Sequence, residues 1–292
     1  MPPHRVEPGP RYLKGYCGGN GFLLLPDPER SVTLSEDAVR GLCDPHTGLG
    51  GDALLHLVRH DRRTGRPATG GRRRVEWFTD CHAADGYPLP LWGPGLGVVA
   101  RYLTVSGLAR PGQMWIGTHT GDRRVLARED GNVTTEMPAP RILGGSWAAL
   151  DGRTHPGVAL SLGPSHLVCV VDVPLACLDL GSAPEADLTV FAGGPGPLTP
   201  DVTVSFANVL TDGSVRLRVH RPGIGETRPC GTTACAAAAA VQHLTGRRGT
   251  TVVRTPRGPV SVTLAAGAPA LLAGTAILVA EGVLDARWLA AL

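Results

Sequence analysis

A single cysteine, Cys230, stands in a small-residue turn ahead of an alanine-rich run, in the stretch RPCGTTACAAAAAVQHL. If that run is a helix, its first turn presents backbone N–H groups without intrahelical partners, and the helix dipole adds positive potential. A carboxylate binds well there, and a cysteine there is expected to favour its thiolate form. Gly231 lets a ligand approach the backbone, and Thr232 and Thr233 add hydroxyl groups. The stretch therefore predicts proton transfer at a carbon next to a bound carboxylate, the alternative being a small buried thiol that only fills space.

The same arrangement occurs a second time, in LWGPGLGVVARYL, where Trp92 takes the place of Cys230 and Gly93 that of Gly231. Two strand-rich halves, each ending in a turn that opens a helix, indicate a pseudo-symmetric protein of two domains.

The domain boundary is expected in the stretch EMPAPR. The first domain then spans residues 1–136, and the second spans 137–279 and carries Cys230. A return of the C-terminal segment, from about 280 to 292, to the first domain fits the same scheme.

Short apolar runs separated by turn residues recur along the chain, which contains 40 glycines and 26 prolines. This rhythm is typical of β-rich sheets, and few segments have the pattern of a helix. We expect an α+β fold with helices at 35–46, 95–107, 234–246 and 284–292.

Composition excludes several classes of partner. The net charge is +3, and no apolar run is long enough to span a bilayer, so neither a nucleic acid nor a membrane is expected as partner. The basic stretch at 61–74 has no interleaved aromatic residues and is predicted to be a solvated hairpin tip.

The cysteines and the single lysine bound the chemistry further. Seven cysteines without a CxxC pair argue against a disulfide framework or a structural metal site, and favour a reduced cytoplasmic protein. Lys14 is the only lysine and stands near an irregular N-terminus, so it is a poor candidate for the Schiff base that a pyridoxal phosphate enzyme needs. No cofactor and no metal are expected.

The motifs, taken in order, resemble those of the diaminopimelate epimerase family, cofactor-independent enzymes that invert an amino-acid α-carbon. The most specific stretch is GIGETRPCGTTACA at 223–236, close to the family pattern G-A-G-E-T-x-A-C-G-[ST]-G-A-C-A. GNGF at 19–22, ADG at 84–86 and GPSH at 163–166 are similar to further family motifs.

The resemblance implies two pseudo-symmetric domains, each a mostly antiparallel barrel-like sheet around a central helix, with the active site in the cleft between them. It implies two cysteines, one from each domain, that act as base and acid on opposite sides of the α-carbon, and it suggests a homodimer. It assigns catalysis to Cys230, and substrate binding to Gly231, Thr232, Asn20 and Gly93. The hydroxyl of the neighbouring Thr233 is a further candidate for substrate binding.

The sequence departs from the family pattern where the first cysteine is expected, because Trp92 stands there. An indole cannot exchange a proton with carbon at neutral pH, and Pro94 removes one N–H from the carboxylate-holding turn. Family amides are replaced by Ala53, Ala83, Pro164 and Thr203, and an acid–arginine pair is replaced by Arg221-Pro222. Most of the polar side chains that would bind diaminopimelate in the family are thus missing.

The favoured hypothesis is an isomerase or epimerase-like enzyme of specialised biosynthesis that moves a proton next to the carboxylate of an amino acid or related small acid. Cys230 serves one face, and Cys81 or His82 is a candidate second acid or base, with His166 and His220 as further candidates. A site with an acid–base group on only one face of the substrate favours isomerisation, a double-bond shift, elimination or ring formation. A Cys/His pair on opposite faces would allow racemisation.

Arg221 predicts a substrate whose far end is anionic or neutral. Two alternatives stay open: retained diaminopimelate epimerase activity with Cys81 replacing the missing thiol, and a non-catalytic binding protein of the same fold.

Overall fold

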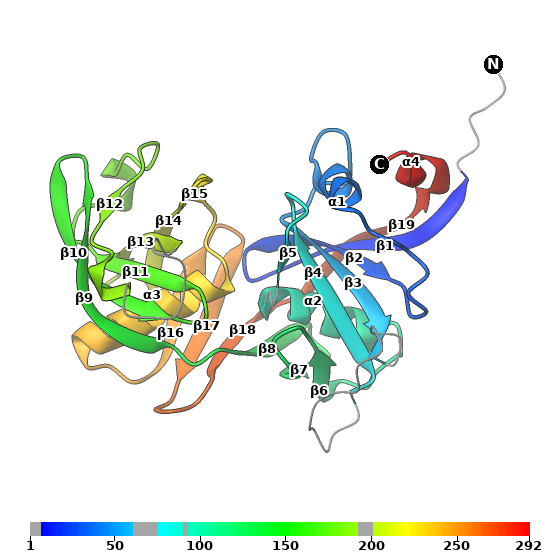
Figure 1. Cartoon of the computed structure of the whole chain (residues 1–292). Helices are drawn as coiled ribbons and strands as arrows, with labels where there is room; N and C mark the ends of the chain where they lie inside the picture. The colour runs from blue at the N-terminus through cyan, green and yellow to red at the C-terminus, as the bar shows by residue number, and fades with distance from the viewer. Residues whose placement is uncertain (1–6, 61–74, 90–92, 192–200) are drawn as a thin grey trace. The chain divides into compact units, whose positions relative to one another are not determined.

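The computed structural model describes residues 7–60, 75–89, 93–191 and 201–292, which form two compact units (Figure 1). Unit 1 comprises Met1–Thr135 and Thr275–Leu292, and unit 2 comprises Glu136–Gly274. The C-terminal return to unit 1 starts at Thr275, earlier than the expected position near 280. The reason is strand pairing, since β19 (Ile277–Asp285) runs antiparallel along β1 (Pro8–Cys17). The hairpin tip expected at 61–74 lies outside the described residues.

Strands are the main regular element of both units, as an α+β sequence with many short apolar runs predicts. The remaining elements of unit 1 are β2 (Asn20–Pro26), α1 (Glu36–Cys43), β3 (Ala53–Arg59), β4 (Trp77–Ala83), β5 (Pro88–Leu89), α2 (Gly93–Val105), β6 (Gly112–Gly117), β7 (Arg123–Ala127), β8 (Asn132–Met137) and α4 (Ala286–Ala290). Unit 2 contains β9 (Arg141–Leu150), β10 (Arg153–Ser161), β11 (Ser165–Val170), η2 (Leu175–Cys177), β12 (Glu185–Ala186), η3 (Thr189–Phe191), β13 (Val202–Val209), β14 (Val215–Arg221), β15 (Gly225–Thr227), α3 (Gly231–Thr245), β16 (Gly249–Thr255), β17 (Gly258–Leu264) and β18 (Ala270–Thr275).

The two units repeat one pattern of strand pairing. In unit 1, β1–β2 and β3–β4 are antiparallel, whereas β2–β3 and β4–β6 are parallel. In unit 2, β10–β11 and β13–β14 are antiparallel, whereas β11–β13 and β14–β16 are parallel. The outer neighbour of β10 is β9, and the C-terminal strand β19 fills the same role beside β1. The return of the C-terminus therefore completes the repeat in unit 1.

Each unit encloses one central helix. The helix α2 packs among strands of unit 1 and α3 among strands of unit 2 (Figure 1). The alanine run at 234–240 is buried along its whole length, because small side chains let the surrounding strands approach the helix from every side. The predicted fold class, two mostly antiparallel units around central helices, is confirmed.

All four predicted helices exist, with shifted ends. Ser35 caps α1, where its Oγ accepts a hydrogen bond from the backbone N–H of Ala38 at 2.9 Å. The helices α2 and α3 begin two and three residues earlier than predicted, at Gly93 and Gly231. None of the helices in the described ranges has the length and apolar character that a bilayer crossing needs.

Candidate active site

Cys230 is the N-cap residue of α3, so its thiol stands directly at the positive end of the unit's central helix. Its backbone is extended, with φ −114° and ψ 179°, and its side chain is half-buried. The hydroxyl of Thr232 lies 3.2 Å from Cys230 Sγ. The backbone N–H groups of the first helical turn, from Gly231 onward, have no intrahelical acceptor. The turn thus combines an accessible thiol with hydrogen-bond donors for a carboxylate.

Thr233 fixes this turn. Its Oγ1 accepts a hydrogen bond from the backbone N–H of Cys230 at 2.8 Å and donates one to the Cys230 carbonyl oxygen at 2.9 Å. Thr233 stands where the family pattern has glycine, and its side chain is buried. Its hydroxyl therefore ties the main chain of Cys230 to the first turn of the helix.

Removing the Thr233 hydroxyl is expected to loosen the turn. The Thr233→Val variant should lose about 1–2 kcal/mol of unfolding free energy, because the buried N–H of Cys230 loses its acceptor. Urea unfolding measures this loss. Thr233→Ser, which keeps the hydroxyl, is the matched control, and equal losses in both variants would contradict the role given to the hydrogen bond.

The other thiols differ from Cys230. Cys177 is exposed, and the remaining five cysteines are all buried. Burial raises the pKa of Cys235, one turn further along α3, far above its ordinary value. Cys230 is the only cysteine of the described residues that stands at a helix N-terminus and is neither fully buried nor fully exposed.

A polar patch lies on the face of the sheet that packs against α3. His166 follows the same alternation as Val168, and Val168 packs with the alanines of α3. Ser205 pairs with Val219. In turn, Val219 pairs with Thr227, three residues before Cys230. Polar side chains from β11, β13 and β15 therefore share the face of the sheet that α3 covers.

This patch holds buried polar atoms that have no hydrogen-bond partner among the described residues. They are both ring nitrogens of His166, Ser205 Oγ and Thr227 Oγ1. Buried polar groups in folded proteins nearly always have a partner, so such a group marks a place where a ligand or water completes the bonding. Sequence reasoning missed Ser205 and Thr227. The signal for Ser205 was the alternation of hydroxyl and apolar residues in VTVSF at 202–206, and that for Thr227 was its place in the motif at 223–236.

Burial, with a smaller contribution from the positive charge of Arg221, lowers the pKa of His166 to about 4. Arg221 is exposed at the end of β14, two residues after the inward-facing Val219. His220 lies on the opposite face, where its backbone pairs with Glu226, and burial also lowers its pKa. Of the two histidines, His166 is the one that faces α3, and it is neutral at pH 7.

His166 should make stability depend on pH. Its pKa is lower in the folded state than the ordinary value near 6.5, so the unfolded chain takes up a proton first as pH falls. Its contribution is therefore complete above pH 6.5 and declines between pH 6.5 and 4, by about 3 kcal/mol in total. We expect urea unfolding of His166→Asn to show a correspondingly flatter pH dependence over this range. Identical slopes in the two proteins would rule out this assignment.

In unit 1, Asn20 and Gly93 stand at the starts of β2 and α2. Asn20 is buried, and its Oδ1 has no partner in the described part of the chain. Trp92 lies outside the described residues. Ala53 and Ala83, which replace a glutamine and an asparagine of the family, are directly opposite each other on β3 and β4. Their two methyl groups form a small apolar surface where the family has two side-chain amides.

Cys81 and His82 point to opposite faces of β4. Cys81 packs in the core with α2, and burial raises its pKa far above the ordinary value. His82 pairs with Leu54, whose side chain packs with α1. It lines a pocket of about 300 Å³ with Asp80, and burial lowers its pKa. Cys81 is therefore a protonated thiol on the side of α2, which is the form that a second acid needs, whereas His82 faces away from α2. The role of either residue as second acid or base stays a prediction.

The described residues bring no three His, Cys, Asp or Glu side chains together in a way that would hold a metal ion. On the face of the sheet away from α3, Arg218 and Glu226 form an ion pair. Arg218 donates through Nε and Nη2 to the two oxygens of Glu226, at 2.6 and 2.7 Å. This pair lowers the pKa of Glu226 and keeps its carboxylate away from proton transfer.

Comparisons with known proteins give full-length matches, although no protein-family model matches the chain. The chain is similar to the diaminopimelate epimerase of Thermobifida fusca strain YX, with 39% identity over 277 residues, 93% of this chain and 97% of that protein. It is 35% identical over 290 residues to the diaminopimelate epimerase of Rhodococcus jostii strain RHA1, which covers 95% and 98% of the two chains. Among solved structures it is similar to a probable proline racemase from Agrobacterium radiobacter K84, with a TM-score of 0.66, 16% identity and coverage of 95% and 93%.

Proposed function

The chain belongs to the diaminopimelate epimerase family and is an enzyme of the isomerase kind, and on that premise we propose that it moves a proton at the carbon next to a carboxylate. The substrate class is an amino acid or a related small acid. The observation that carries the proposal is the accessible thiol of Cys230 at the N-terminus of α3.

The geometry supports a simple sequence of steps. The free N–H groups of Gly231 and Thr232 hold the substrate carboxylate, and the Cys230 thiolate takes the proton from the neighbouring carbon. The electron pair left on carbon spreads into the carboxylate, where the helix N-terminus stabilises the added charge. The proton then returns from the Cys230 thiol to the same carbon or to a neighbouring one.

We propose that the reaction is one-sided. The sequence has Trp92 at the position of the opposing cysteine, burial of Cys81 disfavours the thiolate that a second base would need, and His82 faces away from α2. A single acid–base group favours isomerisation, a double-bond shift, elimination or ring formation over inversion of a stereocentre. These reactions belong to specialised biosynthesis more naturally than to the synthesis of diaminopimelate.

We also propose that the far end of the substrate is anionic or neutral. Arg221 carries its positive charge close enough to His166 to lower the pKa of that imidazole. Because Arg221 is also exposed, its guanidinium can contact a ligand that completes the unpaired polar atoms of the patch. An ammonium group at this position would meet a like charge.

Inversion of diaminopimelate is a second candidate function, because the identity to the Thermobifida fusca diaminopimelate epimerase is 39% and extends over nearly the whole chain. It requires a second acid or base, and Cys81, a buried thiol on the side of α2, is the candidate for that role.

Proton exchange in deuterated water tests the proposal even while the product is unidentified. The protein is incubated with pools of L-amino acids, hydroxy acids and unsaturated small acids, and mass spectrometry detects substrates that gain one mass unit. A substrate that exchanges only when the protein is present supports the proposal. Absence of exchange across amino acids and related acids would favour a non-catalytic binding protein.

Two further properties complete the proposal. A cytoplasmic location is supported by the free cysteines, none of which forms a disulfide in the described structure. The homodimer suggested by the family resemblance is a prediction that analytical ultracentrifugation would check.

A further inference from the structure

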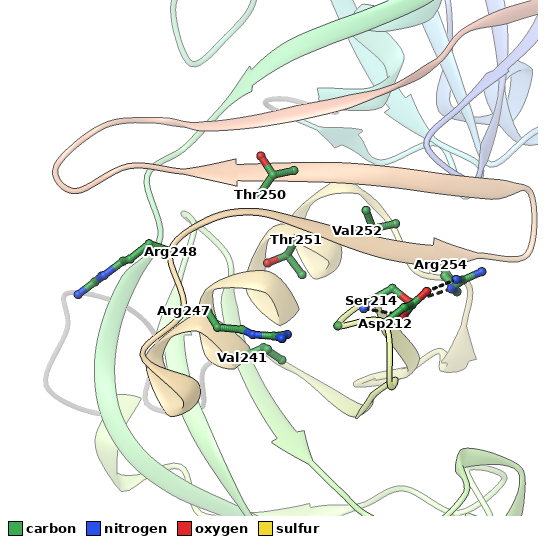
Figure 2. A pocket seen from close by; sticks show the side chains of 10 residues that line it. Asp212, Ser214, Val241, Arg247, Arg248, Thr250, Thr251, Val252 and Arg254 are labelled. Carbon is green, nitrogen blue, oxygen red and sulfur yellow. Dashed lines mark hydrogen bonds and ion pairs between the residues drawn. The ribbon is translucent and has the colours of Figure 1, made fainter.

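A second pocket, of about 490 Å³, opens in unit 2 far from Cys230. Val241 and Arg247 line it near the C-terminal end of α3 (Figure 2). Cys230 stands at the N-terminal end of that helix. A helix of 15 residues is about 22 Å long, which separates the two places by most of the unit. The pocket also borders the turn that precedes β14, whereas Arg221 is at the other end of that strand. It is therefore a site apart from the candidate active site.

Arg247 has no partner for its guanidinium in the described part of the chain. Figure 2 shows its side chain extending across the pocket toward the turn of Asp212 and Ser214. The guanidinium lies close over Gly213, because a Cβ added there would stand 2.5 Å from Arg247 Nη1. Gly213 has φ +78°, a backbone conformation that favours glycine, and a side chain at this position would collide with the guanidinium of Arg247. The positive charge is thus held at the pocket without being neutralised.

The one carboxylate that lines the pocket is already occupied. Asp212 Oδ1 accepts from the backbone N–H and the hydroxyl of Ser214, at 3.0 and 2.6 Å, and Oδ2 accepts from Arg254 Nη2. These bonds lower the pKa of Asp212, so it stays ionised and paired with Arg254. One negative charge therefore faces the charges of Arg254 and Arg247, and a further arginine, Arg248, points outward at the rim in Figure 2.

Positive charge also dominates the chain that forms this side of the unit. Between 201 and 274 the sequence contains three acids, Asp201, Asp212 and Glu226, and Glu226 is bound by Arg218. The undescribed segment 192–200 contains no acid. The arginines of the same stretch are Arg216, Arg218, Arg221, Arg228, Arg247, Arg248, Arg254 and Arg257.

We propose that this pocket binds a small dianion without an aromatic ring, a phosphate ester or a dicarboxylate. The planar fork of arginine matches both oxyanions, and Arg247 presents such a fork. Arg254 already donates through Nε and Nη2 to Ser214 and Asp212, so it adds positive charge beside the fork. Thr251 accepts a hydrogen bond from Gln242 at 3.1 Å and keeps its own hydroxyl proton to donate. No aromatic side chain lines the described pocket, so a nucleobase finds nothing on which to stack.

Calorimetric titration of the whole protein tests this site with inorganic phosphate, glycerol 3-phosphate and succinate, at constant ionic strength with chloride as the reference ion. We expect saturable binding of at least one dianion and a loss of roughly tenfold or more in affinity for Arg247→Ala. Arg247→Lys keeps the charge but not the fork and should bind with intermediate affinity. The ranking of glycerol 3-phosphate and succinate distinguishes the two sources of the dianion.

Arg153→Ala is the matched control, because Arg153 is an exposed arginine of unit 2 outside the pocket. Equal weakening in the Arg153 and Arg247 variants would overturn the proposal in favour of unspecific attraction. Binding no stronger than that of chloride would overturn it outright. The Cys230→Ala variant should bind the dianion unchanged, so this test is independent of the proposed reaction.

Discussion

Deuterium exchange at the α-carbon of the substrate is expected to fall by roughly 10²- to 10⁴-fold or more when Cys230 is replaced by alanine. The variant keeps the backbone N–H groups that hold the carboxylate but loses the atom that carries the proton. The loss should therefore appear in the rate of exchange, while the affinity for the substrate changes little. Mass spectrometry of the substrate in deuterated water measures the rate, and equilibrium dialysis measures the affinity.

Three controls make this result specific. Cys177→Ala removes an exposed thiol elsewhere in unit 2 and should leave exchange unchanged. Trp92→Phe should also keep exchange, because an indole takes no part in proton transfer. Loss of an N-cap costs about 0.5–2 kcal/mol, so circular dichroism should show that Cys230→Ala is folded. Full turnover in Cys230→Ala would show that another group moves the proton.

The fold was largely readable from the sequence because its signals are local. Apolar runs between turn residues predicted the strands, and the repeated small-residue turn before a helix predicted two similar units. The helix starts were predicted too late, at 95 and 234, because glycine, proline and threonine are poor helix formers in a helix interior. In the first turn they are tolerated, since the N–H groups there have no partner in any case. That difference decides the chemistry, because it makes Cys230 the N-cap itself.

The site was only partly readable, since its members are joined by strand register. Ser205 and Thr227 belong to strands far apart in the sequence and meet through Val219 of β14. Alternation along β4 separates Cys81 from His82, but only the structure shows that α2 packs on the side of Cys81. The sequence therefore named chemically suitable neighbours without showing which of them face the same helix.

The protein is expected to form no meso-diaminopimelate from L,L-diaminopimelate, at a detection limit about 10⁴-fold below the wild-type rate on its own substrate. Inversion needs a second group on the opposite side of the α-carbon, and the sequence has Trp92 there. Recognition of the far end of diaminopimelate is also expected to weaken, because Arg221-Pro222 in place of the family's acid–arginine pair leaves the charges of the substrate unpaired. Chiral chromatography of the reaction mixture measures the conversion.

Stepwise variants separate these two causes. Trp92→Cys restores the opposing thiol but leaves Arg221 in place of the family acid, so it should gain little activity on diaminopimelate. Adding Arg221→Glu and Pro222→Arg supplies the missing charge pair and should raise conversion by a further factor of ten or more, since hydrogen bonds to charged groups each contribute about 1.5–3 kcal/mol. Conversion by the unaltered protein would show that diaminopimelate epimerase activity persists despite Trp92. Full conversion by Trp92→Cys alone would show that the substrate is still recognised and that only the second thiol has been lost.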